Sequence, residues 1–148
     1  MRNKTIRIIA LIVMLSMLLT TVVFASTNAS AYIAATSAWI TRDGNTVEVN
    51  FYIVGTSGTM DKIGVKYIYL YEKNGNAWNL VQSYAYTDSQ YAATMMGNNT
   101  GIKAGYVTYS GSASKSYYAD CRFYAEKDGG SDTIQQNTPT SHGTTPTP

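Results

Sequence analysis

Apolar and polar residues alternate along most of the chain between residues 32 and 136. In the segment 47–53 every second residue is apolar, and these residues are Val47, Val49, Phe51 and Ile53. A period of two places such residues on one face of a β-strand, which is typical of a strand with one buried face. The segment 117–126 alternates in the same way, and its inward positions are Tyr117, Ala119, Cys121, Phe123 and Ala125. We therefore predict a strand in each segment.

A first hairpin turn is predicted at Asp43-Gly44, because this pair suits a two-residue turn in which both positions need a positive φ. Arg42 then pairs with Asn45, and Ile40 faces Val47 across the hairpin. Apolar residues match across the two arms in this register. The same register sends Trp39 to the outer face.

A second hairpin is predicted around Asn74-Gly75, with arms over residues 63–73 and 76–87. Lys73 then pairs with Asn76. One face carries a row of aromatic residues, which are Tyr67, Tyr69, Tyr71, Trp78, Tyr84 and Tyr86, together with Ile63 and Val65. The opposite face carries Ile68, Leu70, Val81 and Ala85. Because both faces are partly apolar, the pattern does not decide which one is buried.

The remaining segments complete an all-β chain. The alternation breaks over residues 88–101, where residues 90–96 suit one or two helical turns ended by Gly97, in a crossover connection between sheets. A short strand follows at 103–110, and Asp128-Gly129-Gly130 turns the chain into a last strand at 131–136. About seven strands with frequent turns predict a two-sheet antiparallel sandwich.

Two sets of residues carry a resemblance to known proteins. Tyr117-x-Ala-x-Cys-x-Phe-x-Ala, followed by Gly-Gly-Ser and a final strand, resembles the penultimate strand and hairpin of immunoglobulin-like fibronectin type III domains. The corner tyrosine of that fold corresponds to Tyr117 or Tyr118. Gly58-Thr59-Met60-Asp61-x-Ile-Gly, Trp78, Phe123-Tyr124-Ala125 and Gly129-Gly130-Ser131-Asp132 resemble a family of small secreted proteins of Gram-positive bacteria that has no assigned function. The resemblance covers residues 32–136, and a likeness of fold implies no activity.

Residues 1–25 have the pattern of an export signal. Three basic residues precede an apolar run from Ile8 to Leu19, and small residues at Val23 and Ala25 suit a signal peptidase. A cut after Ala31 is the alternative, and an uncleaved membrane anchor is another. We therefore expect a secreted, extracellular protein that contacts a membrane only through its leader. The expected organisation is a signal peptide over 1–25, a β-sandwich domain over 26–136 and a disordered Thr/Pro/Ser/Gly tail over 137–148.

Charge and cysteine content narrow the function. Three of the 11 basic residues lie in the leader, so 8 basic and 9 acidic residues remain after cleavage. Without a basic cluster, nucleic-acid binding is not expected. The single cysteine excludes an intramolecular disulfide, which fits a bacterial exported domain that relies on its core.

Few residues could carry catalysis or hold a metal, and we expect no catalytic residue, no cofactor and no metal. The only histidine, His142, lies in the tail, which disfavours a histidine-based triad or zinc site. Cys121 faces the core, which favours a small buried hydrophobe over a reactive thiol. Carboxylates that could form a hydrolytic pair stand at turns or outward positions, and these are Asp61, Asp88, Asp120, Asp128, Asp132, Glu48, Glu72 and Glu126. The turn Asp128–Asp132 matches no EF-hand loop.

The chain is rich in tyrosine, with 13 Tyr and 2 Trp against 3 Phe. Tyrosine combines a large contact area with a hydroxyl group, which suits binding surfaces. An outward row would be an aromatic platform for a glycan or protein of the cell envelope, and its candidate residues are Tyr67, Tyr69, Tyr71, Trp78, Tyr84 and Tyr86, with Trp39 on the other sheet. The alternative is that this row is core. We hypothesise a non-catalytic binding module, and the alternatives are a structural or accessory extracellular protein and a small carboxylate-dependent hydrolase.

Overall fold

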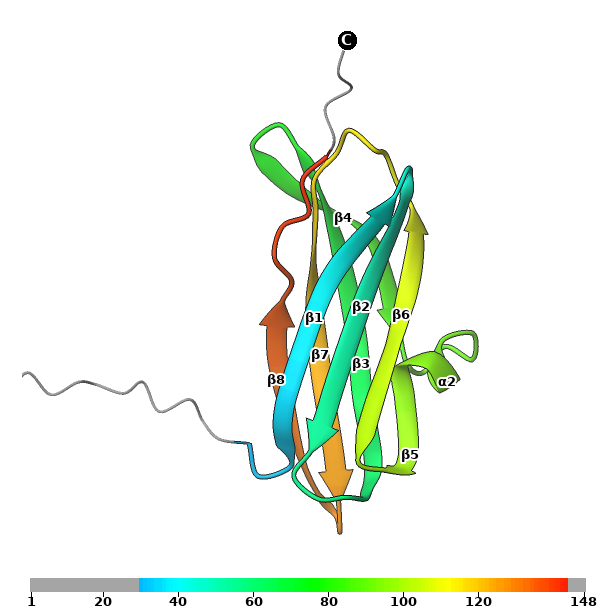
Figure 1. Ribbon diagram of the computed structural model, residues 1–148, viewed down its shortest axis with the longest axis vertical. Coiled ribbons are helices and arrows are strands. Elements are labelled where there is room, and N and C mark those ends of the chain that lie inside the picture. The colour runs from blue at the N-terminus through cyan, green and yellow to red at the C-terminus, as the bar shows by residue number, and fades with distance from the viewer. Residues whose placement is uncertain (1–29, 144–148) are drawn as a thin grey trace, which may run out of the picture.

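A computed structural model describes residues 30–143 and shows two antiparallel β-sheets packed face to face (Figure 1). The three-stranded sheet has the order β1-β2-β6, with bounds β1 Ile33–Asp43, β2 Thr46–Gly55 and β6 Ile102–Ser110. The five-stranded sheet has the order β4-β3-β7-β8, with bounds β3 Met60–Asn74, β4 Ala77–Ala85, β7 Tyr117–Lys127 and β8 Gly130–Asn137, and β5 (Met96–Thr100) also pairs with β3. The predicted all-β two-sheet sandwich is confirmed, with eight strands instead of about seven.

The core lies between the two sheets and is built from the alternating positions of the predicted strands. From β2 it takes Val47, Val49, Phe51 and Ile53, and from β7 it takes Tyr117, Ala119, Cys121, Phe123 and Ala125. Burying one face of each strand in this way removes apolar surface from water, which is the main driving force for folding. Both strands predicted from strict alternation are therefore confirmed.

The connection from β4 to β6 contains a short helix, α2 (Ala92–Met95), and then β5. The predicted helical turn is present, and the segment does cross from the five-stranded sheet to the three-stranded one. Gly97 does not end the helix, however, because it already lies in β5 and pairs with Ile63 of β3. The prediction missed β5, whose sequence Met-Gly-Asn-Asn-Thr has no alternating apolar pattern.

Both predicted hairpins form, but each turn lies one residue further along the chain. The turns are Gly44-Asn45 and Gly75-Asn76, and β1 and β2 pair Ile40 with Val49 instead of Val47. Only the glycine of each turn has a positive φ, 56° at Gly44 and 59° at Gly75. A glycine alone at the first central position is typical of a type II′ turn, whereas the prediction assumed a type I′ turn with glycine second. In the β1–β2 hairpin the partners shift by two residues, so the inward and outward faces stay as predicted.

The last described residues pack against β7. Residues 138–143 were predicted to belong to a disordered tail, yet Thr138 is buried and its hydroxyl oxygen accepts a hydrogen bond from the Ala119 N–H at 2.9 Å. Ser141 and Tyr117 form an isolated antiparallel bridge. The leader and residues 144–148 lie outside the described residues. Within residues 30–143, no helix has the length and apolar character needed to cross a membrane.

Candidate functional site

A β-bulge in β3 decides which of its faces points outward. The register of β3 against β7 shifts between Val65 and Tyr67, which leaves Lys66 as an extra residue. An extra residue reverses the alternation of a strand. Val65 and Ile68 are therefore both buried although they are three residues apart. The tyrosines of β3 that follow the bulge consequently lie on the outer face of the five-stranded sheet.

Five aromatic side chains gather on that outer face and form what we call the outer aromatic surface: Tyr67, Tyr69, Tyr71, Trp78 and Tyr118. The rings of Tyr67 and Tyr69 are parallel within 13°, with centroids 6.0 Å apart. The rings of Tyr71 and Tyr118 lie on neighbouring strands, parallel within 7° and 4.8 Å apart. The Trp78 ring meets Tyr118 edge-on at 4.8 Å. Each ring of this surface therefore contacts another ring.

These distances change the predicted geometry of the surface. Parallel rings with centroids this close are offset-stacked, so each covers part of its neighbour's face. The rings thus stand as one pair and one group of three, and they do not form the flat platform that the sequence suggested. Their mutual contacts hold them in place before any partner arrives, which reduces the entropy cost of binding.

Two predicted members of the row are not on this surface. Tyr84 is only 2% exposed, it pairs with Ile68 of β3, and its hydroxyl group donates a hydrogen bond to the Thr108 carbonyl oxygen at 2.8 Å. Tyr86 is partly buried and packs against the core. The prediction that Tyr84 shares a face with Trp78 is wrong because a second bulge intervenes: Val81 has no partner in the β3–β4 register. The alternative that the whole row is core is also wrong.

Charged groups border the outer aromatic surface. The Lys73 ammonium lies 5.9 Å from the Trp78 ring centroid, which is a cation–π contact. Arg122 is opposite Tyr67 in the β3–β7 register and contacts the Asp120 carboxylate at 3.3 Å. Asp120 was predicted at an outward strand position, yet it is only 9% exposed, and Gln135 also donates a hydrogen bond to its carboxylate at 2.9 Å.

Trp39 lies where the sequence placed it, on the outer face of the three-stranded sheet, and is 42% exposed. Tyr106 of β6 stands in the same cross-strand row and is 55% exposed. The prediction missed Tyr106 and Tyr118. Both occupy outward positions of predicted strands, but only the strand order shows that Tyr106 aligns with Trp39 and Tyr118 with Tyr71.

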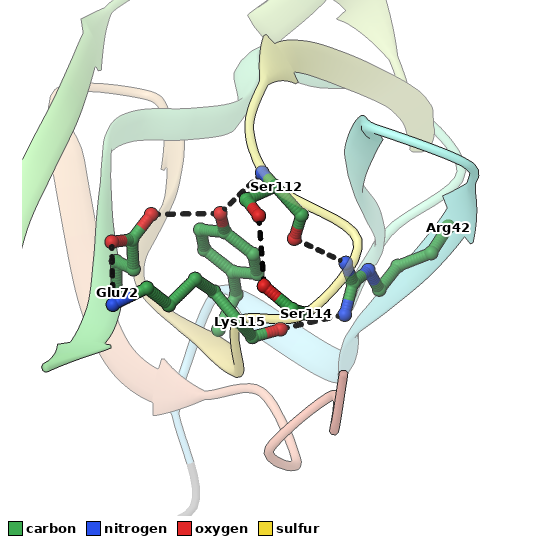
Figure 2. A network of polar contacts seen from close by, with 6 residues as sticks. Arg42, Glu72, Ser112, Ser114 and Lys115 are labelled. Carbon is green, nitrogen blue, oxygen red and sulfur yellow. Dashed lines mark hydrogen bonds and ion pairs between the residues drawn. The ribbon is translucent and has the colours of Figure 1, made fainter. Parts of the chain in front are cut away.

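A polar network closes the sandwich at the end where β1 and β2 meet (Figure 2). The buried Tyr117 hydroxyl donates to a Glu72 carboxylate oxygen at 2.7 Å and accepts a hydrogen bond from the Ser112 N–H at 2.8 Å. The Arg42 guanidinium donates to the carbonyl oxygens of Ser112 and Lys115, both at 2.7 Å, and to that of His142 at 3.2 Å. Lys115 also pairs with Glu72 at 3.9 Å.

This network has the character of a structural closure. Its donors and acceptors are occupied by one another, by backbone groups of the β6–β7 loop and by the His142 carbonyl, so these side chains hold the end of the sandwich together. Burial raises the pKa of Tyr117, the hydrogen bond from the Ser112 N–H lowers it in part, and the Glu72 carboxylate raises it further. The hydroxyl therefore stays protonated and keeps donating its hydrogen bond. The Tyr117 hydroxyl thus bonds to the backbone of Ser112, five residues earlier in the chain. The corner tyrosine of immunoglobulin-like domains makes a contact of this type, so Tyr117 suits that role better than Tyr118.

The remaining candidates for chemistry are dispersed. Burial, and secondarily the Asp120 carboxylate, raises the pKa of the Cys121 thiol to about 12, so the thiolate that nucleophilic attack requires is not populated near neutral pH. Asp61 accepts a hydrogen bond from the Asp128 N–H at 2.8 Å, and Asp132 accepts from the Ser30 hydroxyl at 2.7 Å. Among residues 30–143, no three His, Cys, Asp or Glu side chains converge as a metal site would require.

Comparison of the chain with models of protein families, with curated proteins and with solved structures finds no match. The resemblance to secreted Gram-positive proteins therefore stays a prediction.

Proposed function

We propose that this protein is a secreted, non-catalytic module that binds a protein partner at the cell envelope through its outer aromatic surface. The observation that carries the proposal is the set of five aromatic rings on the outer face of the five-stranded sheet, packed as one pair and one group of three. Folding alone does not require such a cluster on the outer face, since the core on the other side of the same strands is already apolar.

The composition of this surface favours a protein partner. Binding surfaces for proteins are enriched in tyrosine, tryptophan and arginine around a well-packed centre, with a polar rim. Here the stacked rings form the centre, while Arg122 and Lys73 lie at its border. Leu80, opposite Tyr71 and 54% exposed, extends the apolar part onto β4. Export is supported by the basic and apolar pattern of residues 1–25.

The test is capture from a detergent extract of the producing organism's envelope, with the exported protein as bait. Replacing Tyr67 and Tyr69 together by threonine removes one stacked pair while keeping residues that suit a strand. We expect the captured protein to be lost with this double variant, while thermal unfolding stays close to that of the unchanged protein.

Tyr52→Thr is the matched control, because Tyr52 is a half-buried tyrosine on the outer face of the other sheet. It should capture the same protein as the unchanged chain. Equal capture by the Tyr67/Tyr69 double variant, or loss of capture with Tyr52→Thr alone, would contradict the proposal.

A further inference from the structure

The outer face of the three-stranded sheet carries a second arrangement of aromatic side chains. Trp39 pairs with Asn50 in the β1–β2 register, and Asn50 pairs with Tyr106 in the β2–β6 register. The three residues therefore form one row across the sheet, with an aromatic side chain at each end and an amide between them. Because neighbouring strands lie about 4.8 Å apart, the two rings are rooted about 9.6 Å apart.

The two rings of this row are not stacked on other rings. Within residues 30–143, neither Trp39 nor Tyr106 forms a ring–ring pair, unlike the members of the outer aromatic surface. Both are among the most exposed large side chains, and the next row carries small residues, Ser37 and Ala104, on either side of Tyr52. The ring surfaces of Trp39 and Tyr106 are therefore open to a ligand.

This face is almost free of charge. Four neighbouring rows of this face run from Thr41–Glu48–Thr108 to Ala35–Val54–Ile102, and Glu48 is their only acidic or basic residue; Asp43 follows in the row beyond Glu48. The Glu48 carboxylate accepts a hydrogen bond from the Thr41 hydroxyl at 3.1 Å. The same Thr41 oxygen accepts from the Asn50 amide at 2.9 Å, which orients that amide in the middle of the row. A face built from rings, hydroxyl groups and an amide, without a free cation, matches a neutral hydroxyl-rich ligand and opposes a polyanion.

We infer that the Trp39–Asn50–Tyr106 row binds a neutral β-linked polysaccharide chain that lies across the strands of the three-stranded sheet. The C–H faces of pyranose rings pack on the faces of aromatic side chains, and the separation of the two aromatic positions is close to the length of two sugar units in an extended β-linked chain. Alternate sugars then stack on Trp39 and Tyr106, while Asn50 hydrogen-bonds the sugar between them. This inference uses the other sheet and does not rest on the proposed protein partner.

The experiment measures retention of the exported protein, expressed with its own N-terminal segment, on microcrystalline cellulose and on chitin, with α-linked starch as the comparison polymer. Soluble hexasaccharides of the same two β-linked polymers give affinities by calorimetry. We expect retention on at least one β-linked polymer and none on starch. Trp39→Ala and Tyr106→Ala should each weaken binding at least about tenfold, whereas Trp39→Phe and Tyr106→Phe should stay within about threefold because a ring remains.

Two controls keep the inference falsifiable. Tyr67→Ala changes the opposite sheet and should leave glycan binding unchanged, and raising the salt concentration should not weaken binding because the face is neutral. No retention on either β-linked polymer, or unchanged affinity in both alanine variants, would overturn the inference. So would sedimentation data showing that Trp39 and Tyr106 hold two copies of the chain together and that the dimer excludes glycan.

Discussion

The two outer faces of this sandwich use aromatic residues in opposite ways. On the five-stranded sheet the rings contact one another and are bordered by Arg122 and Lys73. On the three-stranded sheet Trp39 and Tyr106 stand apart, separated by Asn50, on a nearly uncharged surface. Aromatic content alone therefore does not define a binding surface. The contacts that each ring already makes decide whether its face is open to a ligand, and the neighbouring charges indicate the chemistry of that ligand.

The largest expected difference is in the free energy of unfolding, between substitutions of Tyr84 and of Tyr67, two residues that the sequence pattern placed in one row. Tyr84→Ala removes a buried ring and its hydrogen bond to the Thr108 carbonyl, so the free energy of unfolding should fall by about 3–5 kcal/mol. Tyr67→Ala should cost less than about 1 kcal/mol, because Tyr67 is exposed. Urea unfolding of both variants tests this, and similar losses would show that Tyr67 also belongs to the core.

A second prediction concerns the stacking that distinguishes the outer aromatic surface. Tyr118→Ala removes the parallel contact with Tyr71 and the edge contact with Trp78, so we expect a loss of about 1–2 kcal/mol. A double-mutant cycle with Tyr71→Ala should give a coupling energy of about 0.5–1.5 kcal/mol. Additive effects of the two substitutions would mean that the rings are not energetically paired.

A third, smaller effect concerns the pH dependence of stability where the residues just before β1 contact β8. Hydrogen bonds from the Ser30 hydroxyl and then from the Tyr32 N–H lower the pKa of the half-buried Asp132 carboxyl below its ordinary value of 3.8. Because the folded-state pKa is depressed, this stabilisation is complete above the ordinary value and is lost as the pH falls through the folded-state value. Unfolding free energies measured from pH 6 to pH 2 should therefore decline less for Asp132→Asn than for the unchanged protein. Parallel curves would contradict a role for this carboxylate.

The smallest expected effect is on the three-stranded sheet. Trp39→Ala should change the free energy of unfolding by no more than about 0.5 kcal/mol, because the ring stacks on no other ring among the described residues and is 42% exposed. Thermal unfolding measures this change. A loss above about 1.5 kcal/mol would show that Trp39 is held by packing, and the contrast between the two faces would then disappear.

Local patterns predicted the strands well because alternation reports directly on one buried face, as in β2 and β7. Details that depend on pairing were not accessible. The extra residues Lys66 and Val81 reverse the faces of β3 and β4, and such bulges arise from fitting a strand to its neighbours. In β3 the change of phase leaves apolar residues on both faces of the pattern, and this did not reveal the bulge. Trp78 was therefore placed correctly, while Tyr84 and Tyr86 were not.

The two aromatic surfaces show the same limit of prediction from sequence. Trp39 could be predicted to face outward from its hairpin register. For Tyr67, Tyr69 and Tyr71 the strand period predicted a shared face but left open whether that face is buried. Tyr118 could not be joined to them, because the pairing of β3 with β7 links residues about fifty positions apart. Tyr106 likewise meets the row of Trp39 only through β2. Long-range pairing of this kind depends on the whole sheet and not on any single segment.

The docking of residues 138–143 along β7 has a mechanical consequence. In Figure 1 the described chain enters at the lower end of the sandwich with β1, and the segment after β8 runs to the upper end. Tension applied at residues 30 and 143 would therefore act along the strands, perpendicular to the hydrogen bonds between them. Strands loaded in this direction must break many hydrogen bonds together, so the domain should resist stretching far better than a sheet that is peeled open from one edge.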